Sequence, residues 1–245
     1  MMLRLHNAGC VSANNPLPVL PDEIIVEILL RLPVRSLLQF KCVCKSWKTT
    51  ISHPQFVKNQ LQISTVYPQL VSYNNIDRGI VFYYPVEPLF ENLSTPIKPV
   101  KVSNCSIIGS CNGLLCLYNI DQFCVKLWNP SINLISKTSP TFNGYGHDGF
   151  ITHHAFGFDQ LNDKYKVLLD VLNKHSYSKK ITLPYTFGEN SWKKIQNCAC
   201  DPISWLGKYV SGTLNWVNKD GLNSSERMIL SFDLEKETYS QVLLP

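Results

Sequence analysis

The chain has 245 residues, which is enough for one large domain or for a small domain followed by a medium one. With 44% apolar and 11% aromatic residues, the composition excludes a disordered, collagen-like or coiled-coil protein. The net charge of +5 is spread without a dense run of Lys or Arg, and no stretch reaches the length of a membrane span. We therefore expect neither a nucleic-acid partner nor a membrane partner.

The cysteines are predicted to be free thiols, because their number is odd and the first fifteen residues lack the apolar core of a secretory signal. Reduced thiols indicate a cytoplasmic or nuclear location. Cys42 and Cys44, like Cys198 and Cys200, are separated by one residue, whereas zinc-binding pairs are separated by about two to four. We expect no metal at these pairs or at the other cysteines, which are Cys10, Cys105, Cys111, Cys116 and Cys124.

Residues 20–61 have the pattern of a compact unit of three helices. Pro21 suits a first helical turn, and the two acids that follow it suit the helix dipole. A broad apolar face then continues to Leu32, and Pro33 ends the helix. About forty residues make a poor core by themselves, so we expect this unit to gain stability from a partner. The alternative is a small domain whose apolar residues pack only its own core.

The second helix of this unit is predicted to begin with a capping box, in which Ser36 is the N-cap and Gln39 is the third helical residue. His53-Pro54 starts a short third helix that carries Phe56 and Leu61. The second helix carries an apolar stripe with spacings of three and four residues, formed by Leu37, Phe40, Cys44, Trp47 and Ile51.

The string LPDEIIVEILLRLPVRSLLQFKCVCKSWKTTISHPQF resembles an F-box and matches nearly the whole of that motif in order and without gaps. In that family the module binds a Skp-type adaptor, which links it to a cullin in a ubiquitin ligase. Some apolar residues must serve the core of the module, and Phe40, Cys44 and Ile51 are the best candidates for that. The resemblance implies that the adaptor-facing residues are Leu20, Pro21, Ile24, Ile25, Ile28, Leu29, Leu32, Pro33, Leu37, Leu38, Val43 and Trp47.

After residue 61, short apolar runs alternate with turn residues, as in a protein of many short strands. One pattern recurs, in which an aromatic residue is followed by an Asn, Asp or Glu and then by a bulky apolar residue. It occurs at Trp128/Asn133/Ile135, Phe158/Asp163/Tyr165, Tyr185/Asn190/Trp192 and Phe232/Glu237/Tyr239. A second repeat relates GLLCL at 113–117 to GTLNW at 212–216.

These repeats group the strands into three units of four, at about 104–139, 153–197 and 207–245. Trp128, Tyr185 and Phe232 are then the aromatic residues of the third strands, 57 and 47 residues apart. A period near 50 with four strands per unit is typical of kelch-type propeller blades, and we expect the three aromatics to point between neighbouring sheets. The alternative is a two-sheet β-sandwich. Two further strands are predicted at 68–86 and could belong to a preceding blade.

The runs IIGSCNGLLCLY, LWNPS, AFGFDQLNDKYKVL and YVSGTLNWV resemble the kelch-like F-box-associated domain of a large plant family. The expected fold is therefore α+β: a small three-helix F-box followed by an all-β, incomplete kelch-like propeller. Since a closed propeller needs at least four blades, we expect the chain to be a truncated member. The predicted organisation is a disordered tail at 1–17, the F-box at 18–62, a connecting segment with candidate first-blade strands at 63–103, and the kelch-like domain at 104–245.

No nucleotide-binding or catalytic motif is evident, so we expect no cofactor and no enzymatic activity. His147, Asp148, His153 and His154 lie close in sequence, but we interpret them as solvated loop residues rather than metal ligands. The resemblances imply a receptor that holds an unknown target protein near the ligase, with the surface that binds the target left unassigned. The alternative is an interaction module outside the ligase, or a fragment that only sequesters adaptor.

Overall fold

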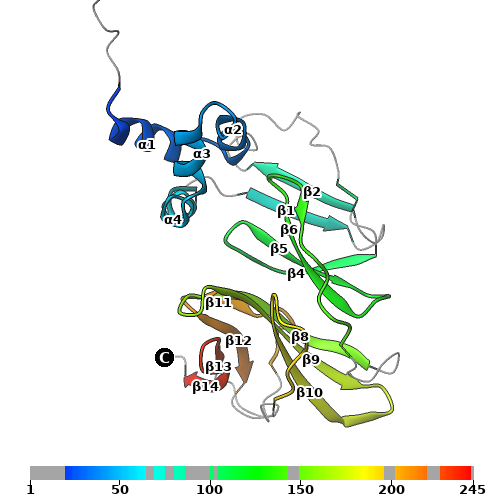
Figure 1. Cartoon of the computed structure of the whole chain (residues 1–245). Coiled ribbons are helices and arrows are strands. Elements are labelled where there is room, and N and C mark those ends of the chain that lie inside the picture. The colour runs from blue at the N-terminus through cyan, green and yellow to red at the C-terminus, as the bar shows by residue number, and fades with distance from the viewer. Residues whose placement is uncertain are drawn as a thin grey trace, which may run out of the picture. The chain divides into compact units, whose positions relative to one another are not determined.

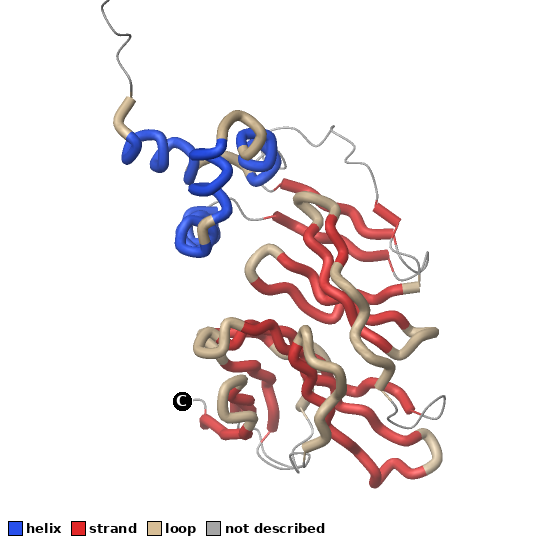
Figure 2. The backbone as a smooth tube through the Cα atoms, in the orientation of Figure 1, coloured by secondary structure: helices blue, strands red, loops and turns tan. Residues whose placement is uncertain are grey.

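The computed structural model describes residues 20–64, 69–74, 80–85, 100–101, 104–142, 149–195, 202–219 and 227–243. The chain divides into two compact units, Met1–Ile63 and Ser64–Pro245. Helices form the first unit and strands form the second, as Figures 1 and 2 show. We call them the helical unit and the β domain. This arrangement confirms the α+β class.

The helical unit contains four helices among its described residues, not three: α1 (Asp22–Leu30), α2 (Val34–Phe40), α3 (Lys45–Ser52) and α4 (Pro54–Ser64). The predicted second helix is broken at Cys44, which has an extended backbone. The Cys44 sulfur accepts a hydrogen bond from the Trp47 N–H at 3.5 Å and so caps α3. The apolar stripe across this break is therefore shared by two helices.

The capping box predicted at Ser36 is wrong, because α2 already begins at Val34 with Pro33 in the N-cap position. The Leu37 N–H donates to the Pro33 carbonyl at 3.1 Å, which closes the first turn before Ser36 could cap it. Pro21 takes the same N-cap position in front of α1. Both helices thus start after a proline, whose φ suits this boundary.

The core of the helical unit is small. Its fully buried side chains are Leu29, Leu37, Ile51 and Phe56. Phe40 and Trp47 pack against this core with their rings edge to face and 5.4 Å apart. So few buried residues agree with the expectation that about forty residues cannot build a large core alone.

In the described part of the β domain, the strands form four antiparallel sheets, in each of which neighbouring strands follow one another in chain order. The first sheet joins β1 (Gln69–Asn74), β2 (Ile80–Pro85) and β3 (Val100–Lys101), and its first two strands fall in the region predicted at 68–86. The second joins β4 (Cys105–Cys111), β5 (Leu114–Asn119), β6 (Cys124–Asn129) and β7 (Leu134–Ile135). The third joins β8 (Gly149–Asp159), β9 (Lys164–Asn173) and β10 (Ser176–Thr186). The fourth joins β11 (Lys208–Val210), β12 (Thr213–Lys219), β13 (Arg227–Asp233) and β14 (Thr238–Leu243).

Neighbouring sheets meet through their first strands: β4 contacts β8, and β8 contacts β11. Glycines permit this close approach. A Cβ atom on Gly109 of β4 would lie 2.6 Å from the Phe156 Cβ of β8, and one on Gly157 of β8 would lie 2.5 Å from the Tyr209 ring of β11. Three sheets in series, each packed on the next, are incompatible with the two-sheet sandwich that the sequence had left open.

The predicted equivalence of Trp128, Tyr185 and Phe232 is confirmed by hydrogen-bond register. Each lies on the third strand of its sheet and is buried. In each case the preceding residue pairs with a residue nine positions further on, through Ser136 N–H to Leu127 O, Lys193 N–H to Pro184 O, and the pairing of Ser231 with Ser240. Tyr185 lies in a core shared by the second and third sheets, and Phe232 in one shared by the third and fourth. The fully buried neighbours of Trp128 all belong to its own sheet.

The polar residue of the recurring pattern has a structural role in three of its four instances. Asn133, Asp163 and Glu237 all have φ of 54°, the left-handed conformation that closes a hairpin. The aromatic residue before each turn then pairs with the apolar residue after it. Asn190, the polar residue of the remaining instance, does not have a positive φ, so this instance forms a different kind of turn.

The fourth strand predicted for the third sheet is reduced to one bridge between Thr182 and Ile195. Two backbone hydrogen bonds join this segment to β10, from Lys193 N–H to the Pro184 carbonyl at 3.1 Å and from Ile195 N–H to the Thr182 carbonyl at 3.0 Å, and side-chain contacts of Trp192 add to them. The Trp192 Nε1–H donates to the Pro140 carbonyl at 2.7 Å, and its ring lies 5.2 Å from that of Phe142. Both partners lie in the segment after β7, so Trp192 joins the third sheet to the second rather than extending a strand.

Candidate functional site

The helical unit exposes a row of apolar side chains along α1. Leu20, Ile24 and Ile28 follow one another at a spacing of four residues and are 56%, 42% and 48% exposed. Ile24 and Ile28 are one turn apart and lie on one face of α1, and Leu20 lies in the segment just before Pro21, the N-cap residue of the helix. Pro21, beside Leu20, is also exposed. Glu27 and Arg31 form an ion pair of 2.6 Å on the same helix, and both are largely exposed. A continuous apolar row on so small a unit is typical of a protein-binding surface.

Three more predicted adaptor-facing residues are exposed outside α1. They are Pro33 before α2, Leu38 on α2 and Val43 in the turn after it. Val43 is 61% exposed, although a Val side chain gains nothing from contact with water. We use the name apolar helical surface for the exposed members of the predicted set, which are Leu20, Pro21, Ile24, Ile28, Pro33, Leu38 and Val43.

Five residues of the predicted set do not lie freely on the surface. Leu29 and Leu37 are 1% and 5% exposed and form the core of the helical unit, so we correct their assignment from partner contact to core packing. Ile25, Leu32 and Trp47 are half-buried against the same core and present only part of each side chain. Periodicity could not separate these groups, because a broad apolar helix face contains both the buried and the exposed side.

The residues predicted for the core are placed there only in part. Ile51 is buried in it, and Phe40 packs on it. Cys44 is exposed, because its sulfur caps α3 rather than pointing inward. Apolar spacing assigned Cys44 to the core on the assumption of one continuous helix, and the break in that helix removes the assumption.

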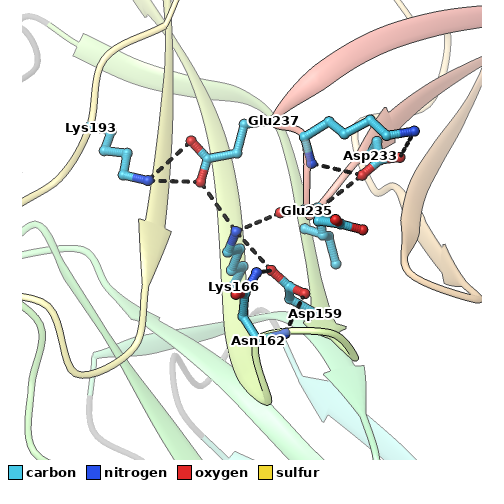
Figure 3. Close-up of polar contacts among 9 residues, drawn as sticks. Asp159, Asn162, Lys166, Lys193, Asp233, Glu235 and Glu237 are labelled. Atoms are coloured by element: carbon cyan, nitrogen blue, oxygen red, sulfur yellow. Dashed lines mark hydrogen bonds and ion pairs between the residues drawn. The ribbon is translucent and has the colours of Figure 1, made fainter.

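The β domain buries charged groups where the third and fourth sheets meet, as Figure 3 shows. The Lys166 ammonium lies 3.0 Å from an Asp159 carboxylate oxygen and 3.2 Å from one of Glu237, and it also donates to the Leu234 carbonyl. Glu237 forms a second ion pair with Lys193, whose Nζ lies 2.9 Å from the Glu237 Oε1. We call Asp159, Lys166, Lys193 and Glu237 the inter-sheet ion network.

The carboxyl groups of this network stay ionised in the folded protein. Burial opposes the charge on Asp159, but hydrogen bonds from Asn162 and the Lys166 ammonium outweigh it, so the Asp159 pKa is lowered. Burial likewise opposes the charge on Glu237, and its contacts with Lys193 and Lys166 lower its pKa overall. The charges are thus compensated inside the domain, which indicates a structural role rather than a reactive site.

A second buried polar group corrects the interpretation of the histidines. His153 lies on β8, not in a solvated loop, and is 6% exposed. Its Nδ1 lies 3.5 Å from the Asp170 carboxylate, and Lys180 Nζ lies 3.2 Å from the same carboxylate. His154 is also on β8, with Nδ1 at 3.0 Å from the Ile108 carbonyl. His147 and Asp148 lie outside the described residues.

Among the described residues, no group of three or more His, Cys, Asp or Glu side chains has the arrangement of a metal site. The six described cysteines are free, with Cys42 and Cys44 exposed and the four of the β domain buried. Cys10, Cys198 and Cys200 lie outside the described residues. No helix in the described part of the chain is long and apolar enough to cross a membrane.

The β domain also contains a groove of about 640 Å³ between the second and third sheets. Ser106 and Ile108 of β4 line one side, and Phe150 and Thr152 of β8 line the other. Trp205 stands at the groove with 76% of its surface exposed. Sequence reasoning missed this site, because Trp205 lies between two repeat units where no periodic pattern marks it. A lone Trp in a segment without strand alternation was the available signal.

Two family models match the chain. An F-box domain matches residues 17–59, and an F-box associated beta propeller domain matches residues 69–245. The first match spans the apolar helical surface. The second contains the four sheets, and its propeller description agrees with sheets that pack in series.

Relatives of the chain come from Arabidopsis thaliana. An F-box/kelch-repeat protein is 29% identical over 240 residues, covering 91% of this chain and 65% of the relative. An F-box protein is 30% identical over 252 residues, covering 92% of this chain and 75% of the relative. Another F-box protein is 29% identical over 237 residues, with 92% and 60% covered.

The chain spans only 60 to 65% of the length of several of these curated relatives. The similarity nevertheless extends through both units, because the aligned part includes more than nine tenths of the chain. The chain therefore belongs to the family of F-box proteins whose F-box is followed by an F-box-associated β-propeller domain.

Proposed function

We propose that this protein is the substrate receptor of a Skp-cullin-F-box ubiquitin ligase, with the apolar helical surface as its adaptor contact. The observation that carries the proposal is the exposed row of Leu20, Ile24 and Ile28 on a unit that matches the F-box model. Burial of large apolar side chains contributes about 1.5–3 kcal/mol each, so such a row provides a strong driving force for docking.

The proposed mechanism is proximity rather than chemistry. The helical unit binds the adaptor, and the β domain holds a target protein, so that a target lysine stays near the conjugating enzyme carried by the ligase. Such tethering raises the effective concentration of the lysine without a reactive group from this chain. We accordingly propose a non-catalytic role. A cytoplasmic or nuclear location belongs to the same proposal and agrees with the six free cysteines described.

The proposal is tested by co-purification of the full chain with a Skp-type adaptor. Leu20→Ala, Pro21→Ala and Ile28→Asp are combined in one variant. All three side chains are exposed, so we expect the fold to persist while adaptor binding is lost, because an unpaired carboxylate buried at an interface is strongly unfavourable. Circular dichroism verifies the helical content of the variant.

Val57→Asp provides a matched control. Val57 is 45% exposed on α4 and lies outside the predicted adaptor-facing set, so the same introduction of charge should leave adaptor binding intact. Undiminished binding by the triple variant, or equal loss in both variants, would contradict the assignment of the surface. Ubiquitinated clients that co-purify with wild type and not with the triple variant would support the receptor role.

A further inference from the structure

The groove between the second and third sheets has a fixed aromatic residue at its rim. The segment that carries Trp205 is bound to β8 at the tryptophan and two residues after it: the His154 N–H donates to the Trp205 carbonyl at 2.8 Å, and the Gly207 N–H donates to the His154 carbonyl at 2.8 Å. The backbone of Trp205 is therefore held in place while its side chain remains exposed.

Two contacts further restrain this segment. His153 Nε2 lies 3.0 Å from the Pro202 carbonyl, and the neighbouring Nδ1 faces Asp170 and Lys180, so a buried polar group anchors the start of the segment. At its other end, Gly207 packs so closely on the Trp216 ring that a Cβ atom would lie 2.4 Å from it. An exposed tryptophan on a restrained backbone loses little freedom when it binds, which is the property of a preorganised contact residue.

The groove beside Trp205 is mainly apolar and aromatic. Its volume of about 640 Å³ falls within the range of about 300–1,000 Å³ that is usual for ligand-binding pockets. Phe150 and Ile120 in its lining are 38% and 39% exposed. The apolar and aromatic lining consists of Ile108, Tyr118, Ile120, Phe123, Phe150, Ile151 and Trp205.

The charge of the lining restricts the chemistry of a partner. Among the described residues, the lining contains one carboxylate, Asp121, which accepts a hydrogen bond from the Asn104 amide at 2.6 Å, and one ammonium, Lys174. Burial lowers the pKa of His154, which also lines the groove, and so favours its neutral form. One positive and one negative group balance, which disfavours nucleic acids and phosphorylated segments, since these require clustered Arg or Lys.

We propose that this groove binds an extended, uncharged segment of a target protein, which inserts a bulky apolar side chain beside Trp205. The inference deepens the proposed function and rests on it for the identity of the occupant as a ligase target. Aromatic residues that are exposed before binding are common energetic centres of protein interfaces, and balanced charge around them matches an uncharged segment. Trp205 and Phe150 are assigned as the main contacts.

The test uses the full chain and a random twelve-residue peptide library displayed on phage. Peptides that are enriched on the chain are synthesised with a fluorescein label, and their dissociation constants are measured by fluorescence anisotropy. We expect enriched peptides with bulky apolar residues and no net charge. Trp205→Ala should weaken their binding at least about tenfold, as for a typical interface hot spot. Phe150→Ala should weaken it less, and Trp205→Phe should restore part of it.

Ile203→Ala is the matched control, because Ile203 lies on the same segment, is 55% exposed and does not line the groove. Its peptide affinity should equal that of wild type. The proposal is overturned if no peptide is enriched, if the enriched peptides are acidic or phosphate-dependent, or if Trp205→Ala binds them as tightly as Ile203→Ala does. The triple variant at the apolar helical surface separates the two ideas: it should lose adaptor and keep the peptides, whereas Trp205→Ala should lose the peptides and keep adaptor.

Discussion

The helical unit and the β domain differ in where they place their charged groups, although both expose some large apolar side chains. The helical unit exposes Ile24, Ile28 and Val43 to solvent and has its ion pair on the surface. The β domain instead buries Asp159, Lys166 and Asp170. It also buries its four described cysteines, whereas the two of the helical unit are exposed.

This difference indicates how the helical unit and the β domain are each stabilised. The β domain compensates the buried charges of Asp159, Lys166 and Asp170 internally and packs sheet on sheet, so its described core is built from its own residues. The helical unit has four fully buried side chains and leaves a large part of its apolar surface unused. Small units of this kind commonly gain stability from a partner, which is why we propose the adaptor contact there.

Among the substitutions that test this difference, Lys166→Met is expected to change the free energy of unfolding most. The substitution leaves the Asp159 carboxylate, whose side chain is 1% exposed, without its cation, and breaking a buried ion pair in this way costs about 3–5 kcal/mol. Unfolding in urea, followed by tryptophan fluorescence, measures the free energy of unfolding.

Lys193→Met is the matched control for that substitution, because the Lys193 side chain is 48% exposed and Glu237 keeps its contact with Lys166. Glu27→Ala in the helical unit removes an exposed pair. Both changes should alter stability by less than about 1 kcal/mol. Equal destabilisation by Lys166→Met and Lys193→Met would refute the claim that burial distinguishes the network.

A smaller effect is expected from acid. The pKa values of Asp159, Asp170 and Glu237 are lowered in the fold, for Asp170 because contacts with His153, Lys180 and Thr182 outweigh the opposing effect of burial. A lowered carboxyl pKa stabilises the fold above the unfolded pKa, and this stabilisation is lost as pH falls through the folded value. Stability of the β domain should therefore decrease below about pH 4.

His154 should cause a separate decrease in stability that begins at a higher pH than the decrease due to the carboxyl groups. Its pKa is lowered by burial, so the unfolded chain binds its proton first, and stability begins to fall below about pH 6.5. Urea unfolding at a series of pH values measures both steps. Lys166→Met should flatten the lower step, whereas His154→Gln should remove the upper one. A stability that rises on acidification would contradict both assignments.

The smallest effect concerns reactivity rather than stability. Cys42 and Cys44 should react with N-ethylmaleimide in the native protein much faster than the four described cysteines of the β domain. Burial raises the pKa of Cys111 to about 12 and also raises that of Cys116, so little thiolate forms at neutral pH. Pulse labelling followed by peptide mass spectrometry measures each site. Rapid native labelling of Cys116 would show that the β domain opens readily.

Local sequence predicted much of the β domain correctly. The alternation of apolar residues predicted the strands of the second and fourth sheets, and the aromatic pattern predicted the equivalence of Trp128, Tyr185 and Phe232. These features depend on strand pairing within a hairpin, which near neighbours in sequence control. The fourth strand predicted for the third sheet is reduced to a bridge between Thr182 and Ile195, and Trp192 in this segment contacts both Tyr185 of its own sheet and Phe142 beyond the second sheet.

In the helical unit the sequence determined that α1 begins after Pro21 and ends before Pro33, since proline restricts the backbone locally. Only the tertiary structure decided which side of that helix is the core. Leu29 and Ile28 are adjacent and both apolar, yet one is 1% and the other 48% exposed. The turn at Cys44 sets the direction of α3, and this direction determines which residues face inward.

The sequence by itself thus determined which segments form helices and which form strands, their order along the chain and the F-box resemblance, because these depend on local residue spacing and motifs. The tertiary structure alone placed Trp205 at a groove, buried His153 beside Asp170 and joined Lys166 to Glu237. The physical reason is distance along the chain: Lys166 and Glu237 are 71 residues apart, and their contact exists only because two sheets pack together.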